Sequence, residues 1–481
     1  MNKLIRTITA GALALGLTLG CAGCGVMPHP EEPGTIPQKL PTDPTPTEPF
    51  TPVTSNGAPV SPHLLELDNL VAAPEYPEMP QCPRQEDYPE GSQQFYQDQD
   101  NWYHQRRQYL TASPDNAHDL DGFLQKALTQ FLDVEGNRVC APLNVYFALA
   151  MLAETTGGSS RQQILDALGH DSIDTLRAQA NQLWKAHYIN DGETTSLMAN
   201  SVWLDREYTF NDGTLASLAE HHYASVFTGD LGTEEMDRQL AAWLDSQTGN
   251  LLSEYTKNIQ LDPLSVFCLA STAYFCADWN SSFSEDSTYP EVFHGAAGDV
   301  TTDFMHGTTM SQRYCTGDGF TAVQLGLSGN HSMWLILPDE GSSPEEVLAS
   351  GEYYRLISDP DSWKKQQLAT VHLSMPRFDI SSDQDLIPGL KAMGIQDVFQ
   401  AEVADYSPMC PDPLVLGKAS HAARVAADEE GVVAAAYTLM IAYATGAPVE
   451  EEIEFTVNRP FLFTITGSDH LPLFAGVVEM P

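Results

Sequence analysis

Serine, lysine and histidine residues occur at several spacings that resemble catalytic motifs, and each can be tested against the chemistry it would need. A nucleophile elbow requires Gly-x-Ser-x-Gly, but the segment around Ser328 ends in Asn330 in place of glycine. The Ser-x-x-Lys spacing of residues 362–365 lacks the SDN and KTG partners of a β-lactamase-type acyl enzyme. His221 and His222 are adjacent and not one helical turn apart, so a zinc-protease motif is absent. These tests leave no positive indication of an enzyme.

Two N-terminal cysteines, Cys21 and Cys24, follow small residues and could carry a different chemistry, attachment of a lipid. Positive charges precede an apolar stretch, residues 8–20, which is long enough for a secretory signal and too short to span a bilayer. The arrangement resembles the lipobox of bacterial lipoproteins, in which the cysteine thiol is lipidated and the cysteine becomes the first residue. An ordinary cleaved signal peptide is the alternative. Both predict an exported, extracellular protein, and the lipobox favours a cell-surface lipoprotein of a bacterium.

The other six cysteines have no metal-ligand spacing, either among themselves or with a pair of histidines. Neither a metal nor a cofactor is therefore expected. The 65 Asp and Glu against 23 Lys and Arg give a net charge of −42. Such a charge repels phosphates and anionic lipids, which argues against nucleic-acid binding and against any membrane contact other than a lipid anchor.

The most unusual segment, residues 428–454, has an acidic start, an uncharged centre and an acidic end. Alternate residues of the centre are mostly small, beginning with Val432, Ala434, Ala436 and Thr438, so that one face could enter a sheet without overpacking it. A buried central strand is the simpler interpretation of this composition. As an exposed loop the segment would be prone to aggregate. It could be a loop in one state of the protein and a strand in another.

Helical periodicity dominates the first part of the globular region, and strand-like runs dominate the later part. This order predicts an α+β fold. Prolines before the globular region favour extended polyproline II conformations, as in a semi-rigid stalk. The acidic, aromatic residues that follow the stalk could pack on the main domain or remain loose. The predicted organisation has four parts: a signal peptide with lipobox-like cysteines (1–24), a Pro-rich stalk (25–62), an acidic aromatic extension (63–114) and a globular domain (115–481).

Motifs spread over the globular domain resemble the serpin family of protease inhibitors. Glu429-Glu430-Gly431 followed by alanines and Thr438 is similar to the serpin hinge, the first part of the reactive-centre loop. Further similar motifs occur in order along residues 137–168, 272–283, 335–340, 375–378, 421, 458–463 and 474–477. The resemblance implies a fold of three β-sheets and about nine helices with an exposed reactive-centre loop, in a protein that is a monomer and not an enzyme.

The resemblance also implies an activity, suicide inhibition of a serine protease. In the family the protease cleaves the loop and becomes an acyl-enzyme, and the hinge then inserts into the large sheet as a new strand. The implied hinge consists of Glu429, Glu430, Gly431, Val432, Ala434, Ala435, Ala436 and Thr438. Counting from the hinge glycine places the reactive bond at Thr445–Gly446, with Tyr443 and Ala444 as nearby alternatives. Threonine suits elastase-like or subtilisin-like proteases, whereas Tyr443 suits a chymotrypsin-like pocket.

Some positions depart from the family pattern. The implied gate beneath the sheet comprises Ala141, Asn144, Ser271, Trp279 and His421. Ala141 and Asn144 stand where the family usually has serines, and Ser271 stands where it usually has asparagine. Asn144 and Ser271 could have exchanged roles, which would keep one amide and one hydroxyl near His421. Unrelated drift of buried polar residues is the alternative, and a non-inhibitory serpin acting as a surface binding or structural protein is the alternative function.

Overall fold

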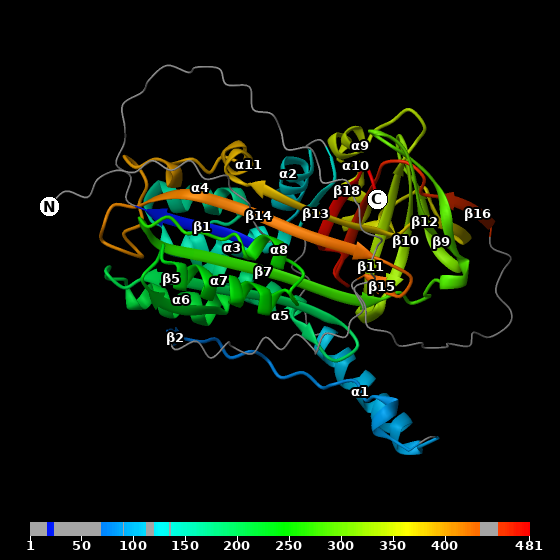
Figure 1. The fold of residues 1–481 in the computed structure, drawn as a ribbon, viewed down its shortest axis with the longest axis horizontal. Helices are drawn as coiled ribbons and strands as arrows, with labels where there is room; N and C mark the ends of the chain where they lie inside the picture. Colours follow the sequence, from blue (N-terminus) through cyan, green and yellow to red (C-terminus); the bar gives the residue numbers. More distant parts are fainter. Residues whose placement is uncertain (1–16, 24–68, 90, 112–119, 134–135, 433–450) are drawn as a thin grey trace.

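The computed structural model describes residues 17–23, 69–89, 91–111, 120–133, 136–432 and 451–481 (Figure 1). The expected α+β class is confirmed. Helices surround one long sheet, and a second group of strands lies beyond one end of that sheet. The described α-helices are α1 (Gln93–Thr111), α2 (Asp121–Leu132), α3 (Pro142–Thr155), α4 (Gly158–Leu168), α5 (Ile173–His187), α6 (Asp212–His222), α7 (Glu234–Gln247), α8 (Ser253–Thr256), α9 (Pro344–Ser350), α10 (Glu352–Ser358) and α11 (Ile387–Ala392). None of these helices combines the length and apolar character needed to cross a bilayer.

The first sheet, called the large sheet below, has nine described strands. Its main path runs β1-β14-β15-β7-β5-β6-β2, with β13 paired to β14 and β4 paired to β5. The strands are β1 (Leu17–Gly23), β14 (Val415–Ala427), β15 (Gly431–Val432), β7 (Ser265–Asp278), β5 (Thr195–Asp205), β6 (Ala224–Gly229), β2 (Leu70–Ala72), β13 (Phe378–Asp385) and β4 (Ile189–Asn190).

The second group also has nine described strands, in the order β16-β12-β9-β10-β11-β17-β18-β3 with β8 paired to β9. Strand β9 is 19 residues long; its first half pairs with β8 and its end pairs with β10. Strand β9 therefore joins strands that would otherwise form two separate sheets. For this reason the described residues contain two continuous sheets where three were expected. The strands are β16 (Glu451–Thr456), β12 (Gln366–Pro376), β9 (Gly298–Thr316), β10 (Phe320–Leu327), β11 (His331–Pro338), β17 (Phe461–Thr466), β18 (Pro472–Val478), β3 (Arg138–Cys140) and β8 (Thr288–Gly295).

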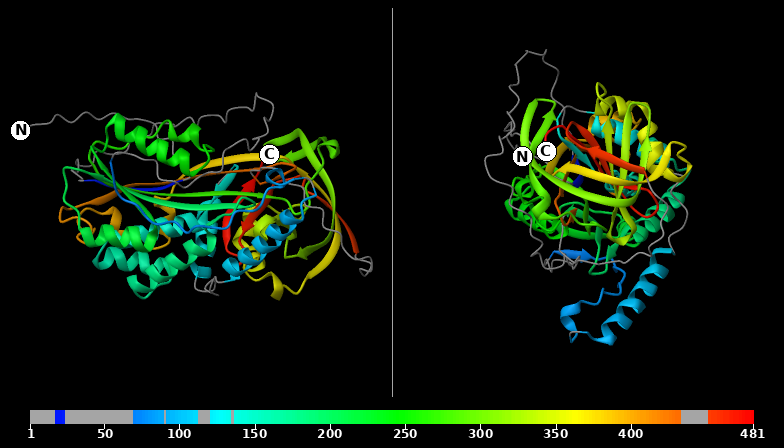
Figure 2. Two further views of the ribbon diagram at one scale, coloured as in Figure 1. Left: turned by 90° about the horizontal axis from the view of Figure 1, so that it is seen from below. Right: turned by 90° about the vertical axis from the view of Figure 1, so that its right-hand side faces the viewer.

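Both faces of the large sheet are covered by helices (Figure 2). Residues of α7 such as Trp243 pack against Trp203, Cys268 and Ala422 on one face. The intervening strand residues, such as Leu269, face the main core on the other side, where α3 lies. Because successive side chains of a strand point to opposite faces, a segment that enters this sheet buries every second residue in the main core.

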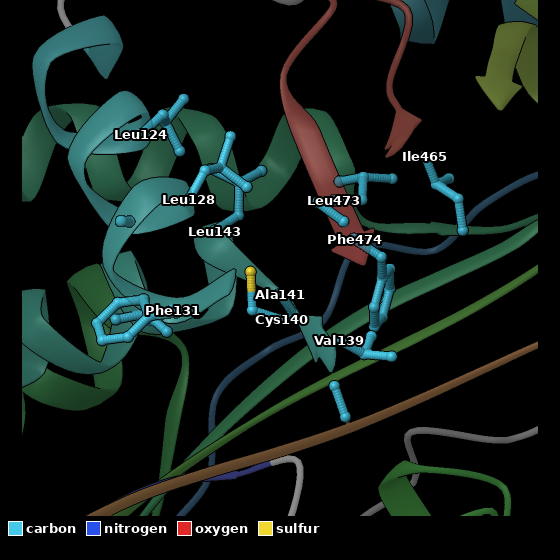
Figure 3. Close-up of a cluster of buried hydrophobic side chains, with 14 of the residues drawn as sticks. Leu124, Leu128, Phe131, Val139, Cys140, Ala141, Leu143, Ile465, Leu473 and Phe474 are labelled. Carbon is cyan, nitrogen blue, oxygen red and sulfur yellow. The ribbon is translucent and has the colours of Figure 1, made fainter. Parts of the chain in front are cut away.

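The main core extends to the end of the large sheet through strand β3. Figure 3 shows Val139, Cys140 and Ala141 between helix α2, which carries Leu128 and Phe131, and strand β18 with its neighbour β17. Helix α3 begins directly after Ala141 with Pro142 at its first position, where the missing N–H costs no hydrogen bond. All of its residues are buried, as expected for a helix beneath a sheet.

Strands β7 and β14 are not paired with each other in the described residues, because two shorter segments lie between them. Strand β15 pairs with both strands at one end. Strand β1 is antiparallel to both and occupies the space further along (Figure 1). The apolar N-terminal segment that the sequence assigns to a signal peptide thus contributes a strand to the centre of the large sheet.

The described part of the acidic aromatic extension packs on the domain. Strand β2 pairs with β6 at the edge of the large sheet, and helix α1 projects from the body (Figure 1). The ring of Tyr76 stacks on Tyr188, with 5.7 Å between the ring centroids. Of the two possibilities left by the sequence, packing on the main domain holds for these residues.

Candidate functional site

The expected hinge begins as a strand between β7 and β14. Val432 is paired with Ala427 of β14 and with Ala277 of β7, and its side chain is buried. The family usually has threonine or serine at this position, but valine fits the space between two alanines without a polar partner. The first two residues after the acidic cluster are therefore already seated in the large sheet.

Gly431 is required by a close approach of backbone to backbone. A Cβ atom at this position would lie 2.3 Å from the carbonyl oxygen of Ala277 and 2.7 Å from the Cα of Asp278. Both contacts are with main-chain atoms, which cannot move aside cheaply. The backbone of Gly431 lies outside the left-handed region, so its conformation alone does not require glycine. Glycine is needed because no space is left for a Cβ atom.

Glu429 anchors the hinge through a buried ion pair. Its side chain accepts hydrogen bonds from Arg377, whose Nε lies 2.9 Å from both carboxylate oxygens, and from the hydroxyl of Thr288. Burial alone raises the pKa of Glu429, but the hydrogen bonds from Arg377 and Thr288 outweigh burial and lower it. The carboxylate therefore stays ionised and holds the base of the hinge to Arg377, which follows β12, and to the start of β8.

Trp279 also holds the base of the hinge. Its indole Nε1 donates to the carbonyl of Asp428 (2.8 Å), and its backbone N–H donates to the carbonyl of Glu430 (2.9 Å). The Asp428 carboxylate accepts from the backbone N–H groups of Glu430 and Gly431, and burial raises the pKa of Asp428. The result is a tight turn that directs the chain into the sheet.

Four of the five expected gate residues lie together beneath the large sheet. The amide of Asn144 donates to the hydroxyl of Ser271 (2.8 Å), and the backbone N–H of Ala141 donates to Nε2 of His421 (3.0 Å). All four residues are buried. Burial lowers the pKa of His421 to about 4, so the ring is neutral at pH 7. The amide of Asn144 and the hydroxyl of Ser271 are thus in direct contact, and their exchange of roles relative to the family stays a prediction.

Trp279 does not belong to this gate, contrary to its grouping from the sequence. It follows the end of β7, eight residues beyond Ser271, which corresponds to about 26 Å along an extended strand. The gate lies under the middle of the sheet, whereas Trp279 contacts the hinge at its end. The two sites are separate because β7 has 14 residues and runs the full length of the sheet.

Sequence reasoning missed several partners of these sites. The Ser382 hydroxyl accepts from the backbone N–H of Val139 and donates to its carbonyl, which supports the strand next to His421. Gln384 is paired with His421 across β13 and β14. No alternation in the sequence marks these two, because residues 381–385 are all polar. Arg377 lies in a motif that the sequence analysis identified, but nothing in that motif indicates Glu429 as its partner.

A narrow, mainly apolar cavity lies between β7 and β14, directly after Val432 along the path of the hinge. Its lining combines residues from both strands, from the region after α7 and from the core below: Ala141, Thr248, Leu251, Leu252, Ala273, Tyr274, Phe275, Ala422, Ala423, Arg424, Val425, Val432, Ile465 and Phe474. The cavity continues the strand position that β15 begins.

The remaining site predictions lie outside the described residues. These are the hinge residues Ala434, Ala435, Ala436 and Thr438, the reactive-bond residues Tyr443, Ala444, Thr445 and Gly446, and the possible lipidation site Cys24. Cys21 lies in β1, where its backbone pairs with Cys268. In the described part of the chain, no group of three or more His, Cys, Asp or Glu side chains is arranged to hold a metal ion.

Comparison with known proteins agrees with this geometry. Residues 123–481 match the family model described as "Serpin (serine protease inhibitor)". The chain is 28% identical to mouse Serpin B11 over 369 residues, covering 73% of this chain and 94% of that protein. It is 29% identical to pig plasminogen activator inhibitor 1 over 361 residues, covering 72% and 87%.

Solved structures are similar in fold. The thermophilic serpin tengpin in its native state superposes with a TM-score of 0.67 at 22% identity, covering 76% of this chain and 94% of tengpin. Arabidopsis AtSerpin1 in its native stressed conformation gives 0.64 at 23% identity, covering 77% and 98%. Since the family match spans most of the chain and every element of the large sheet from β5 to β15, this chain belongs to the serpin family of serine protease inhibitors.

Proposed function

We propose that this chain is a suicide-substrate inhibitor of serine proteases, acting by insertion of its reactive loop into the large sheet. The observation that carries the proposal is the seat of β15: the hinge already pairs with both β7 and β14, and a cavity continues its path. A loop whose first residues were not already paired in this way would have to separate β7 from β14 before it formed any backbone hydrogen bonds with them.

The register of β15 indicates where further hinge residues would go. In an antiparallel pair each step along the hinge is one step back along both neighbours, so Ala434 would lie between Phe275 and Val425. Ala436 would lie between Ala273 and Ala423. All four of these neighbours line the cavity. Small side chains at the alternate positions match this space.

Thr438 would arrive between Ser271 and His421 in the same register. In the structure this place is taken by Thr18 of β1, so β1 must leave before Thr438 can enter. The hydrogen bonds Asn144–Ser271 and Ala141–His421 hold the residues on both sides of this place. In the proposed mechanism they set the barrier that keeps the intact protein in its active, kinetically trapped form.

The chemistry belongs to the protease. Its serine oxygen attacks the carbonyl carbon of Thr445, the bond to Gly446 breaks, and the new amino terminus leaves with Gly446 while an ester joins the two proteins. Insertion then adds backbone pairing along β7 and β14 and buries the alternate side chains, at roughly 1.5–3 kcal/mol for each large apolar residue. Elastase-like or subtilisin-like proteases fit Thr445 as the reactive residue, and a chymotrypsin-like protease fits Tyr443.

Export is part of the proposal. Residues 1–24 are proposed to act as a signal peptide, with lipid attached to Cys21 or Cys24, so that a proline-rich stalk holds the inhibitor at a bacterial cell surface. Mass spectrometry of the mature protein, with Cys21→Ser and Cys24→Ser variants, would identify the modified residue. A mature N-terminus without lipid would instead indicate an ordinary cleaved signal peptide and a secreted protein.

The direct test mixes the purified chain with elastase-, subtilisin- and chymotrypsin-type proteases. The proposal expects complexes that survive SDS, and it expects loop-cleaved protein to melt well above intact protein because insertion releases stored free energy. Cleavage without complexes and without a gain in melting temperature would favour the non-inhibitory binding or structural role.

A further inference from the structure

The described part of the N-terminal extension, residues 69–89 and 91–111, lies outside the family match. Besides the pairing of β2 with β6, it contacts the large sheet at a turn. This turn, residues 191–194, connects β4 to β5. The backbone N–H of Cys82 donates to the carbonyl of Asp191 on the outward pass of the extension. Helix α1 brings Arg106 to the same turn on the return pass, and Trp102 of α1 donates to the carbonyl of Pro80, which ties the two passes together.

Arg106 is the buried centre of this contact, with 8% of its surface exposed. Its Nε lies 2.7 Å from Oδ2 of Asp191, a residue that is 1% exposed, and its Nη1 is paired with Glu193. Its Nη2 donates to the hydroxyl of Thr194 (3.1 Å). One guanidinium therefore serves two carboxylates and a hydroxyl, in an environment where an unpaired charge is costly.

The same contact continues to the base of the hinge. The hydroxyl of Thr194 lies 2.9 Å from the hydroxyl of Ser328, which accepts from the backbone N–H of Asp278 (3.3 Å). Asp278 is the residue of β7 that pairs with Gly431 of the hinge. The chain of contacts thus connects the extension to the strand residue beside which the hinge enters.

The turn between β10 and β11 accommodates Arg106 closely. Gly329 has φ of +74°, and a Cβ at this position would lie 2.7 Å from the Thr194 hydroxyl and 3.0 Å from Nη2 of Arg106. Arg106 is therefore held between a turn of the large sheet and a turn of the second group of strands. Relative movement of the two turns would break its contacts.

We propose that the N-terminal extension restrains opening of the large sheet, with Arg106 as the residue that fastens it. While Arg106 is in place, the ends of β5 and β7 stay fixed to the turn at Ser328, and the hinge can advance only when these contacts are broken. The extension thereby slows unproductive insertion of an uncleaved loop. This last consequence rests on the proposed inhibitory function, whereas the restraint itself does not.

Hydrogen exchange of the whole protein tests the restraint without any protease. Arg106→Gln leaves Asp191 and Glu193 without a counter-charge, and exchange of backbone amides at residues 273–278 and 195–198 should rise about tenfold or more, where tenfold corresponds to about 1.4 kcal/mol. Arg206→Gln is the matched control: it removes the exposed pair with Asp230 at the opposite end of β5. In Arg206→Gln the exchange rates of the same backbone amides should stay within about twofold of those in the parent protein.

Two further variants separate a specific restraint from general damage. Arg106→Lys keeps the charge but loses the three-way contact, so its exchange should fall between parent and Arg106→Gln. Arg106→Gln with Glu193→Gln removes one stranded carboxylate and should recover part of the protection. Equal exchange in Arg106→Gln and Arg206→Gln, or no recovery in the double variant, would overturn the proposal.

Loss of inhibitory activity on storage at raised temperature gives the second readout. Arg106→Gln should lose activity about tenfold faster than the parent, and Arg206→Gln at the parental rate. If no variant inhibits any protease while the exchange differences persist, the inhibitory function fails and the restraint stands. If inhibition is normal and exchange is unchanged, the restraint alone fails.

Discussion

The side-chain amide of Asn144 donates a hydrogen bond of 2.8 Å to the hydroxyl of Ser271, joining helix α3 to strand β7 beneath the large sheet. Both residues are almost wholly buried. The two side chains therefore form a buried amide–hydroxyl pair between the helix and the strand. This relationship gives the first prediction.

Asn144→Ala should destabilise the intact protein by about 1–3 kcal/mol, because the buried Ser271 hydroxyl loses its partner. The double variant Asn144→Ser with Ser271→Asn should remain within about 1 kcal/mol of the parent, because it restores an amide–hydroxyl pair in the opposite orientation. Denaturant midpoints of intact protein would measure both. If the loss of unfolding free energy in the double variant equalled the sum of the losses in the two single variants, the hydrogen bond would not couple the two residues.

His421 should make the intact protein lose stability as the pH falls. Its pKa is lowered from 6.5 to about 4 by burial, so between these values the unfolded chain binds a proton that the folded protein does not. Its contribution is therefore fully present above pH 6.5 and is lost as the pH falls towards 4, by at most about 3 kcal/mol. In the described residues, Nδ1 of His421 has no hydrogen-bond partner to receive the added proton.

The variant His421→Gln can keep an acceptor for the Ala141 N–H without a titrating ring. Its stability should fall less steeply than that of the parent between pH 7 and 5, with a remaining slope from His331, whose pKa burial also lowers to about 4. His294→Gln is the control, since the side chain of His294 is exposed. Identical pH curves for parent and His421→Gln would contradict this assignment.

Ala434→Glu should convert the inhibitor into a substrate. The register of β15 carries this position into the main core between Phe275 and Val425, where an unpaired charge is costly, so deacylation should outrun insertion. Ala435→Glu is the matched control: its position lies between Tyr274 and Arg424 on the opposite face, where the new carboxylate would lie beside a guanidinium that already pairs with Asp379. The number of inhibitor molecules consumed per protease should rise severalfold only for Ala434→Glu. Equal values for the two variants would argue against insertion in this register.

The N-terminal strand should compete with the reactive loop. Thr18 of β1 pairs with Ser271, the place on β7 that Thr438 would take in the inserted loop. A chain that begins at Cys24 should therefore form protease complexes more efficiently than the full-length chain. Leu19→Pro in the full-length chain should do the same, because proline cannot donate to the ladder of a central strand. The measurement is the number of inhibitor molecules consumed for each protease molecule inhibited. If this number were the same for the full-length chain, the shortened chain and Leu19→Pro, β1 would not compete with the loop.

The local pattern of the sequence was sufficient for the fold class, whereas the hinge was assigned from the resemblance to the serpin family. Runs with a period of 2 or 3.6 report which face of a single element is apolar, and Gly431 with the small alternate residues after it marks a segment able to enter a crowded sheet. The resemblance to the family, and not periodicity, grouped Ala141, Asn144, Ser271 and His421. In the structure these four residues form two buried hydrogen-bonded pairs, Asn144 with Ser271 and Ala141 with His421.

Tertiary structure alone decided which distant residues become partners. Arg377 and Glu429 are 52 positions apart and Arg106 and Thr194 are 88 apart, and no periodicity links either pair. Trp279 was grouped with the gate through the family-like motif of residues 272–283, yet a strand extends its residues over the length of the sheet and carries the indole to the hinge. A local pattern specifies the direction of a side chain on its own element. What that side chain meets depends on how the elements pack, and this determined the hinge anchor, the gate and the contact of the N-terminal extension.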